Sequence, residues 1–184
     1  MMKLPDIEIL DEKEKILHQK SKEVVFPLSS DDKKMIQDMI TYLTMSQIDE
    51  ERERYDLRAG MGLSAVQIGV LKRIFVVVEE KEKGTFKNYI VINPKIESYS
   101  EEKIYVGEGE GCLSINREVE GIVPRYARMT VSAYDENGKK YDIRVREDIS
   151  IAFQHEIDHL NGILFTDKID PKNPFKDQDK MREI

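Results

Sequence analysis

The chain has 184 residues, of which 40% are hydrophobic and 35% are charged, and its formal net charge is −7. This composition predicts a globular protein with one domain, residues 1–184, and excludes a disordered or membrane-spanning chain, because no apolar run approaches the roughly 20 residues that cross a bilayer. The negative charge argues against broad nucleic-acid binding, and the single cysteine and the absence of an apolar signal core predict a cytoplasmic protein without an intrachain disulfide.

A helix that begins at Ser29 or Ser30 is the first predicted element. Either serine can cap the helix, and the two aspartates that follow suit its positive N-terminal end. We expect the charged stretch 49–54 to form an exposed loop or the last turn. One face is apolar, since five residues recur at spacings of three and four: Met35, Ile36, Met39, Ile40 and Leu43.

Several short strands follow this helix. Residues 59–69 contain three glycines, which suggests an irregular strand whose backbone approaches something closely. A buried strand is predicted at 74–78, a polar loop at 81–87, a strand at 89–93 that stops at Pro94, and an extended segment at 97–106. Asn137 and Gly138 predict a hairpin turn between strands 129–134 and 141–145. Because the strands run consecutively between two helices, the predicted fold class is α+β with mostly antiparallel pairing.

The second helix carries the sequence FQHEIDHLNG, residues 153–162, with two of the three histidines of the chain. A spacing of four places His155 and His159 on one helical face. A separate apolar stripe is expected to bury against the sheet, and Pro171 and Pro174 preclude a continuous helix further on. The stripe consists of Ile149, Phe153, Ile157, Leu160 and Leu164.

The H-E-x-x-H pattern places two imidazoles within reach of one metal ion, with Glu156 beside them as a general base. The alternative is a pair of solvated histidines on a charged helix. A catalytic site needs a third protein ligand, and the residues leave it open between the acids Asp167, Asp170 and Glu183 and the thiol of Cys112. The glycine-rich setting of Cys112, at positions 107, 109 and 111, is poor for core packing and favours a functional thiol.

Three stretches in order resemble one family. GMGLSAVQ (60–67) is similar to the family's G-x-G-L-A-A-x-Q, EGCLS (110–114) matches E-G-C-L-S, and QHEIDHLNG (154–162) matches Q-H-E-x-D-H-L-x-G. The family is peptide deformylase. The stretch 47–57 resembles an insertion of the longer, Gram-positive bacterial subgroup.

The resemblance implies that Cys112, His155 and His159 bind the metal, with water in the fourth position. Glu156 would take the proton of this water, which attacks the formyl carbon of an N-formylmethionyl peptide and releases formate. Gln67 and the N–H of Leu113 would stabilise the oxyanion. The implied metal is Fe²⁺, which Zn²⁺, Ni²⁺ or Co²⁺ can replace. The implied partners are nascent chains and, transiently, the ribosome, and we expect a monomer with no membrane partner.

The resemblance also assigns substrate contacts. Backbone at Met61, Gly62 and Gly111 would pair with the extended peptide, and Ile151, Ala152 and Met61 would line the methionine pocket. A Glu110–Arg125 ion pair would support the cysteine loop. The chain departs from the family pattern at three positions, Ser64, Val66 and Asp148. Asp148 stands where an apolar or aromatic residue often precedes the catalytic helix, and this departure bears on the shape and polarity of the methionine pocket.

Two other hypotheses are compatible with the sequence. One is a zinc metallopeptidase with Glu183 or Asp170 as the third ligand. The other is a non-enzymatic module that binds nascent chains or a metal. Outside the motifs, we expect His18 to lie on the surface, and Asp158 to be either a supporting residue of the site or a surface acid.

Overall fold

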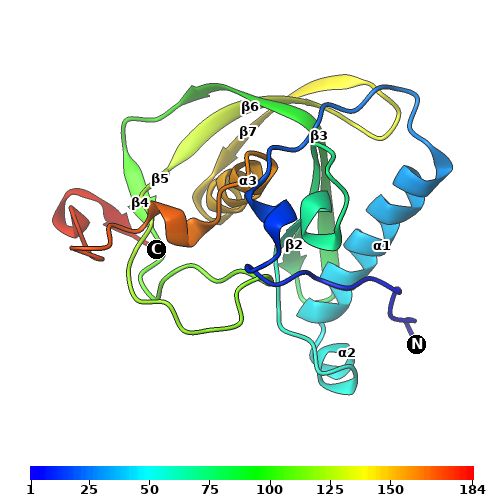
Figure 1. Cartoon of the computed structure of the whole chain (residues 1–184), viewed down its shortest axis with the longest axis horizontal. Helices are drawn as coiled ribbons and strands as arrows, with labels where there is room; N and C mark the ends of the chain where they lie inside the picture. Colours follow the sequence, from blue (N-terminus) through cyan, green and yellow to red (C-terminus); the bar gives the residue numbers. More distant parts are fainter.

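Two β-sheets and three α-helices make up the fold of the computed structural model, which describes all 184 residues (Figure 1). Five strands form the main sheet in the order β1-β2-β3-β6-β7, and every neighbouring pair is antiparallel. The smaller sheet has the order β5-β4-β8, in which β4 and β8 are parallel. The predicted α+β class with mostly antiparallel strands is therefore confirmed. The strands are β1 (Gly62–Ser64), β2 (Ile74–Glu82), β3 (Thr85–Tyr99), β4 (Lys103–Tyr105), β5 (Arg125–Tyr126), β6 (Arg128–Tyr134), β7 (Lys140–Arg146) and β8 (Arg182–Glu183).

The apolar run of strand β2 is continuous because both faces of the strand are covered. Helix α1 (Ser30–Gln47) packs on one face, where Ile74, Val76 and Val78 belong to the same core cluster as the apolar stripe of α1. Helix α3 (Glu147–Leu160) packs on the other face against Phe75 and Val77. Successive side chains of a strand point to opposite faces. A strand buried on both sides therefore reads as an unbroken hydrophobic stretch.

Helix α1 begins as the sequence predicts. The Ser29 hydroxyl accepts a hydrogen bond from the backbone N–H of Asp32 at 3.1 Å. The stretch expected as a loop or last turn is instead a separate helix, α2 (Asp49–Arg54). Ile48 between the two helices has an extended backbone. Three acids in the first turn of α2 and two arginines in its last turn complement the helix dipole, which accounts for a short helix in so charged a segment.

The predicted loop at 81–87 and the strand end at Pro94 are both wrong. Strand β2 continues to Glu82 and β3 starts at Thr85, so only Lys83 and Gly84 connect them. Pro94 lies inside β3, where the pairing with β6 shifts register between Ile92 and Lys95. Such a bulge tolerates a residue without an N–H. The expected extended segment 97–106 is divided between β3 and β4, which belong to different sheets.

Other predicted elements are confirmed. Residues 59–69 form the short strand β1 followed by a 3-10 helix, Ala65–Ile68. Strands β6 and β7 form a hairpin through Asn137 and Gly138, where Gly138 has a φ of +76°. The chain beyond α3 contains only 3-10 helices and β8, as its prolines predict. No helix of the structure combines the length and apolar character that crossing a membrane requires.

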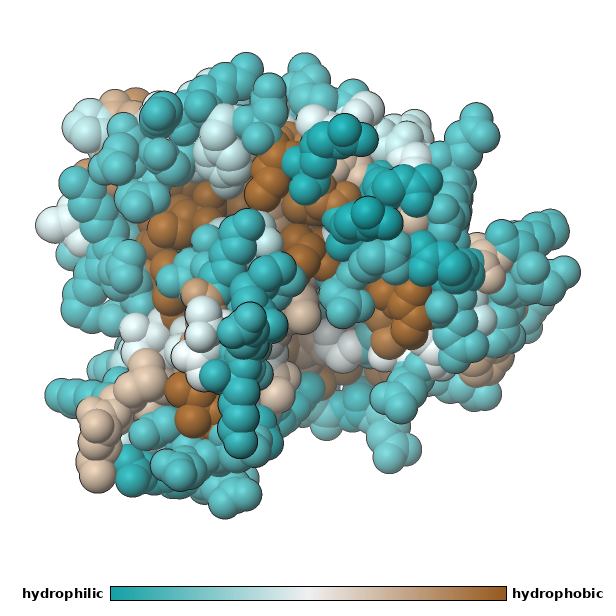
Figure 2. All heavy atoms as spheres, turned by 180° about the vertical axis from the view of Figure 1, so that it is seen from behind, coloured by the Kyte–Doolittle hydropathy of each residue, from teal (hydrophilic) through white to brown (hydrophobic).

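Helix α3 lies in the middle of the molecule, with the strands of the main sheet curving around it (Figure 1). Four members of its predicted stripe pack against the sheet: Ile149, Phe153, Ile157 and Leu160. Leu164 does not, because the chain turns at Gly162, whose φ is +73°, and Leu164 packs with Cys112 instead. The side of the molecule opposite to the view of Figure 1 is largely hydrophilic, with apolar side chains gathered in recesses (Figure 2).

Candidate active site

Three side chains from two distant parts of the chain converge beside α3. The ligand atoms of Cys112, His155 and His159 all lie within 4.8 Å of one another, and all three residues are buried. Cys112 Sγ is 3.3 Å from His159 Nε2. A tetrahedral zinc-type ion with ordinary bond lengths has its sulfur and nitrogen ligands about 3.5 Å apart. The three residues therefore fit a metal ion with little rearrangement.

The two imidazoles differ in their surroundings. Nδ1 of His155 donates to Glu110 Oε1 at 2.9 Å, so its Nε2 is the nitrogen that remains for a ligand. Burial, and then the charge of His155, hold the pKa of His159 well below its usual range. The neutral imidazole of His159 is the form that coordinates metals.

A buried ion-pair network supports the cysteine loop and α3. Arg125, whose side chain is 1% exposed, donates two hydrogen bonds to Glu110 and one to Asp158 at 2.6 Å. Burial opposes the charge of Glu110, but the hydrogen bonds from Arg125 and His155 lower its pKa to about 2. The Glu110–Arg125 pair lies where the resemblance implies it. Asp158 is part of the same network and also pairs with Lys168 at 2.9 Å.

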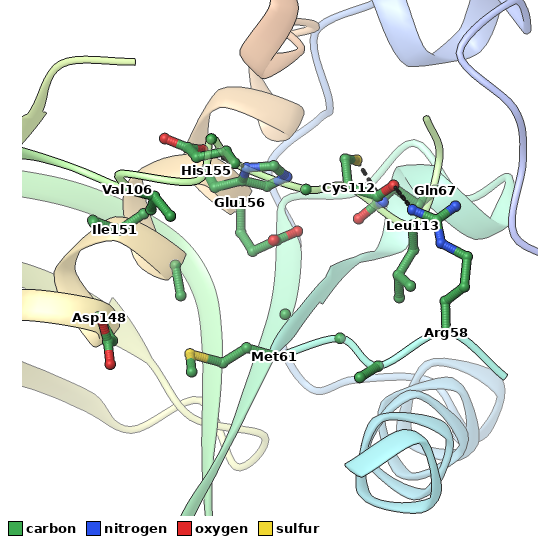
Figure 3. A pocket seen from close by; sticks show the side chains of 17 residues that line it. Arg58, Met61, Gln67, Val106, Cys112, Leu113, Asp148, Ile151, His155 and Glu156 are labelled. Carbon is green, nitrogen blue, oxygen red and sulfur yellow. Dashed lines mark hydrogen bonds and ion pairs between the residues drawn. The ribbon is translucent and has the colours of Figure 1, made fainter. Parts of the chain in front are cut away.

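Glu156, a residue of α3, lies beside the cluster of Cys112, His155 and His159 and points into the hollow in front of it (Figure 3). It is 3% exposed, and its Oε1 has no hydrogen-bond partner within the protein. Burial raises the pKa of this carboxyl from 4.5 to about 7. A carboxylate that titrates near neutral pH is suited to accept and return a proton.

Gln67 and Leu113 border the cysteine. Nε2 of Gln67 donates to Ser114 Oγ at 3.1 Å and lies 3.7 Å from Cys112 Sγ, while its Oε1 accepts from both the N–H and the hydroxyl of Ser64. These bonds fix which end of the amide faces the cysteine. No hydrogen bond within the chain occupies the N–H of Leu113. Both groups are thus donors next to the ligand cluster.

A hollow of about 320 Å³ opens in front of these groups (Figure 3). Met61, Ile151 and Ala152 line it together with Val106, so the side chains predicted for a methionine pocket do lie together. Glycine at position 62 leaves room for the base, because a Cβ there would lie 2.7 Å from Glu156 Oε2 and would force the Glu156 side chain to move. At Gly111 a Cβ would meet nothing within 4 Å, so the protein itself leaves that side open.

Two further residues of the site, Arg58 and Phe165, were not predicted from the sequence. Arg58 donates to the carbonyl oxygen of Cys112 and to Asn116 Oδ1, both at 2.8 Å. Phe165 stacks on His155 with ring centroids 5.9 Å apart. The one sequence signal for Arg58 is its position just before the GMGL stretch, and Phe165 has no such signal.

The acids that a metallopeptidase would need are used elsewhere. Asp167 Oδ2 accepts from the N–H of Leu164, and Asp170 Oδ1 accepts from the N–H groups of Lys172 and Asn173. Glu183 lies in β8 with its side chain against Gly107. None of the three belongs to the cluster that Cys112 completes. His18 is exposed, as expected.

Comparison with known proteins places this site in a family. Residues 7–175 match the sequence model of polypeptide deformylase. The chain belongs to the peptide deformylase family. It is therefore a metal-dependent hydrolase that removes the N-formyl group from nascent polypeptides.

Related sequences and structures agree with this membership. The chain is 46% identical to a peptide deformylase of Macrococcus caseolyticus over 163 residues, covering 88% of this chain and 89% of the relative. It is 44% identical to peptide deformylase 2 of Bacillus anthracis over 177 residues, 96% of each. These relatives confirm the resemblance to the Gram-positive subgroup.

Solved peptide deformylases have the same fold. The crystal structure of the Thermotoga maritima enzyme has a TM-score of 0.70 and 31% identity, covering 90% of this chain and 98% of that one. A plant peptide deformylase has a TM-score of 0.76 and 26% identity, covering 98% of this chain and 89% of that one.

Proposed function

We propose that Cys112, His155 and His159 hold the catalytic metal of this deformylase and that the metal is Fe²⁺ in the cell. The observation that carries this proposal is the convergence of one thiol and two imidazoles within 4.8 Å beside a buried glutamate. A thiolate with two imidazoles suits zinc or iron(II). Zn²⁺, Ni²⁺ and Co²⁺ are expected to substitute. When bound, the ion supplies the Lewis-acid chemistry that makes water a nucleophile near neutral pH and polarises the formyl carbonyl.

Glu156 is the general base of the proposed reaction. Its carboxylate takes a proton from the attacking water and later passes this proton to the amine that leaves. Its burial and its pKa of about 7 support this role, because the group can hold and release a proton near neutral pH. Its unpartnered Oε1 leaves one oxygen for water.

Gln67 and Leu113 stabilise the developing oxyanion. The amide Nε2 of Gln67 and the N–H of Leu113 are donors on the border of the ligand cluster, and donors that are held in place before the reaction stabilise charge most effectively. The hydrogen bonds from Ser64 support the role of Gln67, since they keep its carbonyl turned away from the cysteine.

The substrate lies in the hollow as an extended chain. Strand β1 is an edge strand of the main sheet, where a peptide can pair with the backbone at Met61 and Gly62, while the N–H of Ser64 is already bonded to Gln67. In this proposal the backbone at Met61, Gly62 and Gly111 binds the peptide, and Met61, Ile151 and Ala152 contact the methionine side chain. We extend the proposal to the cellular setting: a cytoplasmic monomer that meets formylated nascent chains during transient contact with the ribosome.

Formate release from N-formyl-Met-Ala-Ser by protein loaded anaerobically with Fe²⁺ tests the proposal. Glu156→Gln is expected to keep the metal and lose about 10²- to 10⁴-fold in kcat. Cys112→Ser is expected to lose metal affinity, whereas Asp170→Asn, a change of an acid outside the cluster, should not. Retention of both metal and turnover by Cys112→Ser would contradict the ligand assignment.

The identity of the metal needs a separate experiment. A thiolate ligand to iron is prone to oxidation. The Fe²⁺ form is therefore expected to lose activity in air or peroxide faster than the Ni²⁺ form of the same protein. Equal loss in the two forms would count against this expectation, and metal analysis of protein isolated without oxygen identifies the native ion.

A further inference from the structure

Asp148 differs from every other charged side chain of the catalytic hollow. Four acidic or arginine side chains line the hollow: Arg58, Glu110, Asp148 and Glu156. Arg58 donates to Asn116 and to the carbonyl of Cys112, while Glu110 and Glu156 are enclosed by protein. Arg58 is also exposed but is held by these two hydrogen bonds, whereas the exposed carboxylate of Asp148 has no hydrogen-bond or ion-pair partner within the protein. Its carboxylate is a free negative charge at the rim.

An acid in the first turn of a helix has an ordinary structural use, because it complements the helix dipole. Glu147 already lies in the same turn of α3 and pairs with Arg182 at 2.7 Å. The dipole accounts for an acid at this end of α3 but not for its place on the wall of the hollow. In Figure 3, Asp148 and Arg58 lie at opposite ends of the view, with Met61 between them.

The geometry of an extended substrate decides which of its side chains meets Asp148. Alternate side chains of a strand point to the same side, so the third residue of a formylated peptide follows the methionine on one face, about 6.6 Å further along. Ile151 contacts the methionine in the proposed function. Asp148 precedes Ile151 by three residues, which is about 4.5 Å along the helix axis. Asp148 therefore lies about one helical turn from the residue that contacts the methionine. This separation is within the distance between the first and third side chains of an extended peptide.

We infer that Asp148 selects formylated peptides with a cationic side chain, lysine or arginine, at the third residue. This inference rests on the proposed function of the hollow. The free carboxylate attracts a cation, repels an acidic side chain, and has no partner within the protein to lose. Because the second side chain of an extended peptide points to the opposite face, its charge is not read by Asp148.

Three peptides test the inference: N-formyl-Met-Ala-Lys, N-formyl-Met-Ala-Gln and N-formyl-Met-Ala-Glu. At low ionic strength the kcat/KM ratio of the lysine to the glutamate peptide is expected to be about 3- to 30-fold, the size of an exposed ion pair together with the matching repulsion. The ratio should approach one in 1 M salt, where the screening length is about 3 Å. Asp148→Asn should reduce the ratio to within about twofold, and Asp148→Lys should invert it.

Asp142→Asn is the matched control, because Asp142 is an exposed acid of β7 that does not line the hollow. Asp142→Asn should keep the parental kcat/KM ratio of the lysine to the glutamate peptide. A second control moves the charge to the second residue of the peptide: Asp148→Asn should not change the kcat/KM ratio of N-formyl-Met-Lys-Ala to N-formyl-Met-Glu-Ala. Equal kcat/KM for the lysine and glutamate peptides in the parent, or an unchanged ratio in Asp148→Asn, overturns the inference. Failure to deformylate any of the peptides would instead contradict the proposed function.

Discussion

The Glu110 carboxylate lies 2.9 Å from Nδ1 of His155 and also accepts two hydrogen bonds from Arg125. One acidic side chain thus joins the loop of Cys112 to helix α3. The resemblance implied a pair of Glu110 with Arg125 behind the cysteine loop; the link to His155 appears only in the structure. A carboxylate behind a ligating histidine orients the ring and raises its basicity.

Glu110→Gln is expected to weaken metal binding by about 10- to 100-fold, because the amide can still contact His155 but carries no charge. It should also destabilise the fold by about 3–5 kcal/mol, since Arg125 remains buried with one of its two acidic partners missing. Chelator competition and denaturant unfolding measure the two effects. Glu108→Gln, an exposed acid two residues away, is the matched control and should change neither quantity.

The raised pKa of Glu156 predicts a pH-dependent penalty in metal-free protein. Burial raises the pKa from 4.5 to about 7, so the folded state binds its proton more tightly than the unfolded state. The stability that this group contributes is complete below pH 4.5, falls as the pH rises from 4.5 to 7, and is lost above pH 7. Glu156→Gln does not titrate. After chelation, the variant should gain stability relative to the parent between pH 5 and 8 in thermal unfolding, and a constant difference would contradict the shift.

Two glycines of the hollow should respond differently to alanine. In Gly62→Ala the new Cβ would lie 2.7 Å from Glu156 Oε2, so the base must move and kcat should fall at least tenfold. In Gly111→Ala the Cβ meets no protein atom within 4 Å, so the free energy of unfolding should change by less than about 0.5 kcal/mol. The KM of Gly111→Ala should nevertheless rise if the peptide backbone passes there. Steady-state kinetics and denaturant unfolding separate these outcomes, and an unchanged KM would remove Gly111 from the substrate site.

Ser64 holds Gln67 through its hydroxyl, at 3.0 Å from Gln67 Oε1. Ser64→Ala is expected to lower kcat about two- to fivefold with little change in KM, because one hydrogen bond that orients an oxyanion donor is lost while the N–H of residue 64 still holds the amide. Ser21→Ala serves as the control, since Ser21 is also buried but its hydroxyl has no partner. A rise in KM alone would argue against an oxyanion role for Gln67.

Elements with strong periodicity were predicted well. The cap and apolar face of α1, the β6–β7 hairpin and the stripe of α3 depend on local patterns that tertiary contacts reinforce. One error occurred where long-range strand pairing overrides a local signal, and another where charges within a short segment favour a helix. Pro94 lies within a strand because β3 has a bulge against β6, and residues 49–54 form a helix because their charges complement its ends.

The sequence by itself determined the chemistry of this protein. The spacing of His155 and His159 places two ligands on one face of a helix, because the helical repeat is the same in any fold, and the three motifs in order indicated the family. Only the tertiary structure decided the third ligand on physical grounds. Cys112 lies 47 residues before His159, and no local rule relates positions so far apart. The packing of α3 in the curve of the main sheet brings them to 3.3 Å, buries Glu156 and leaves Asp148 free at the rim of the hollow.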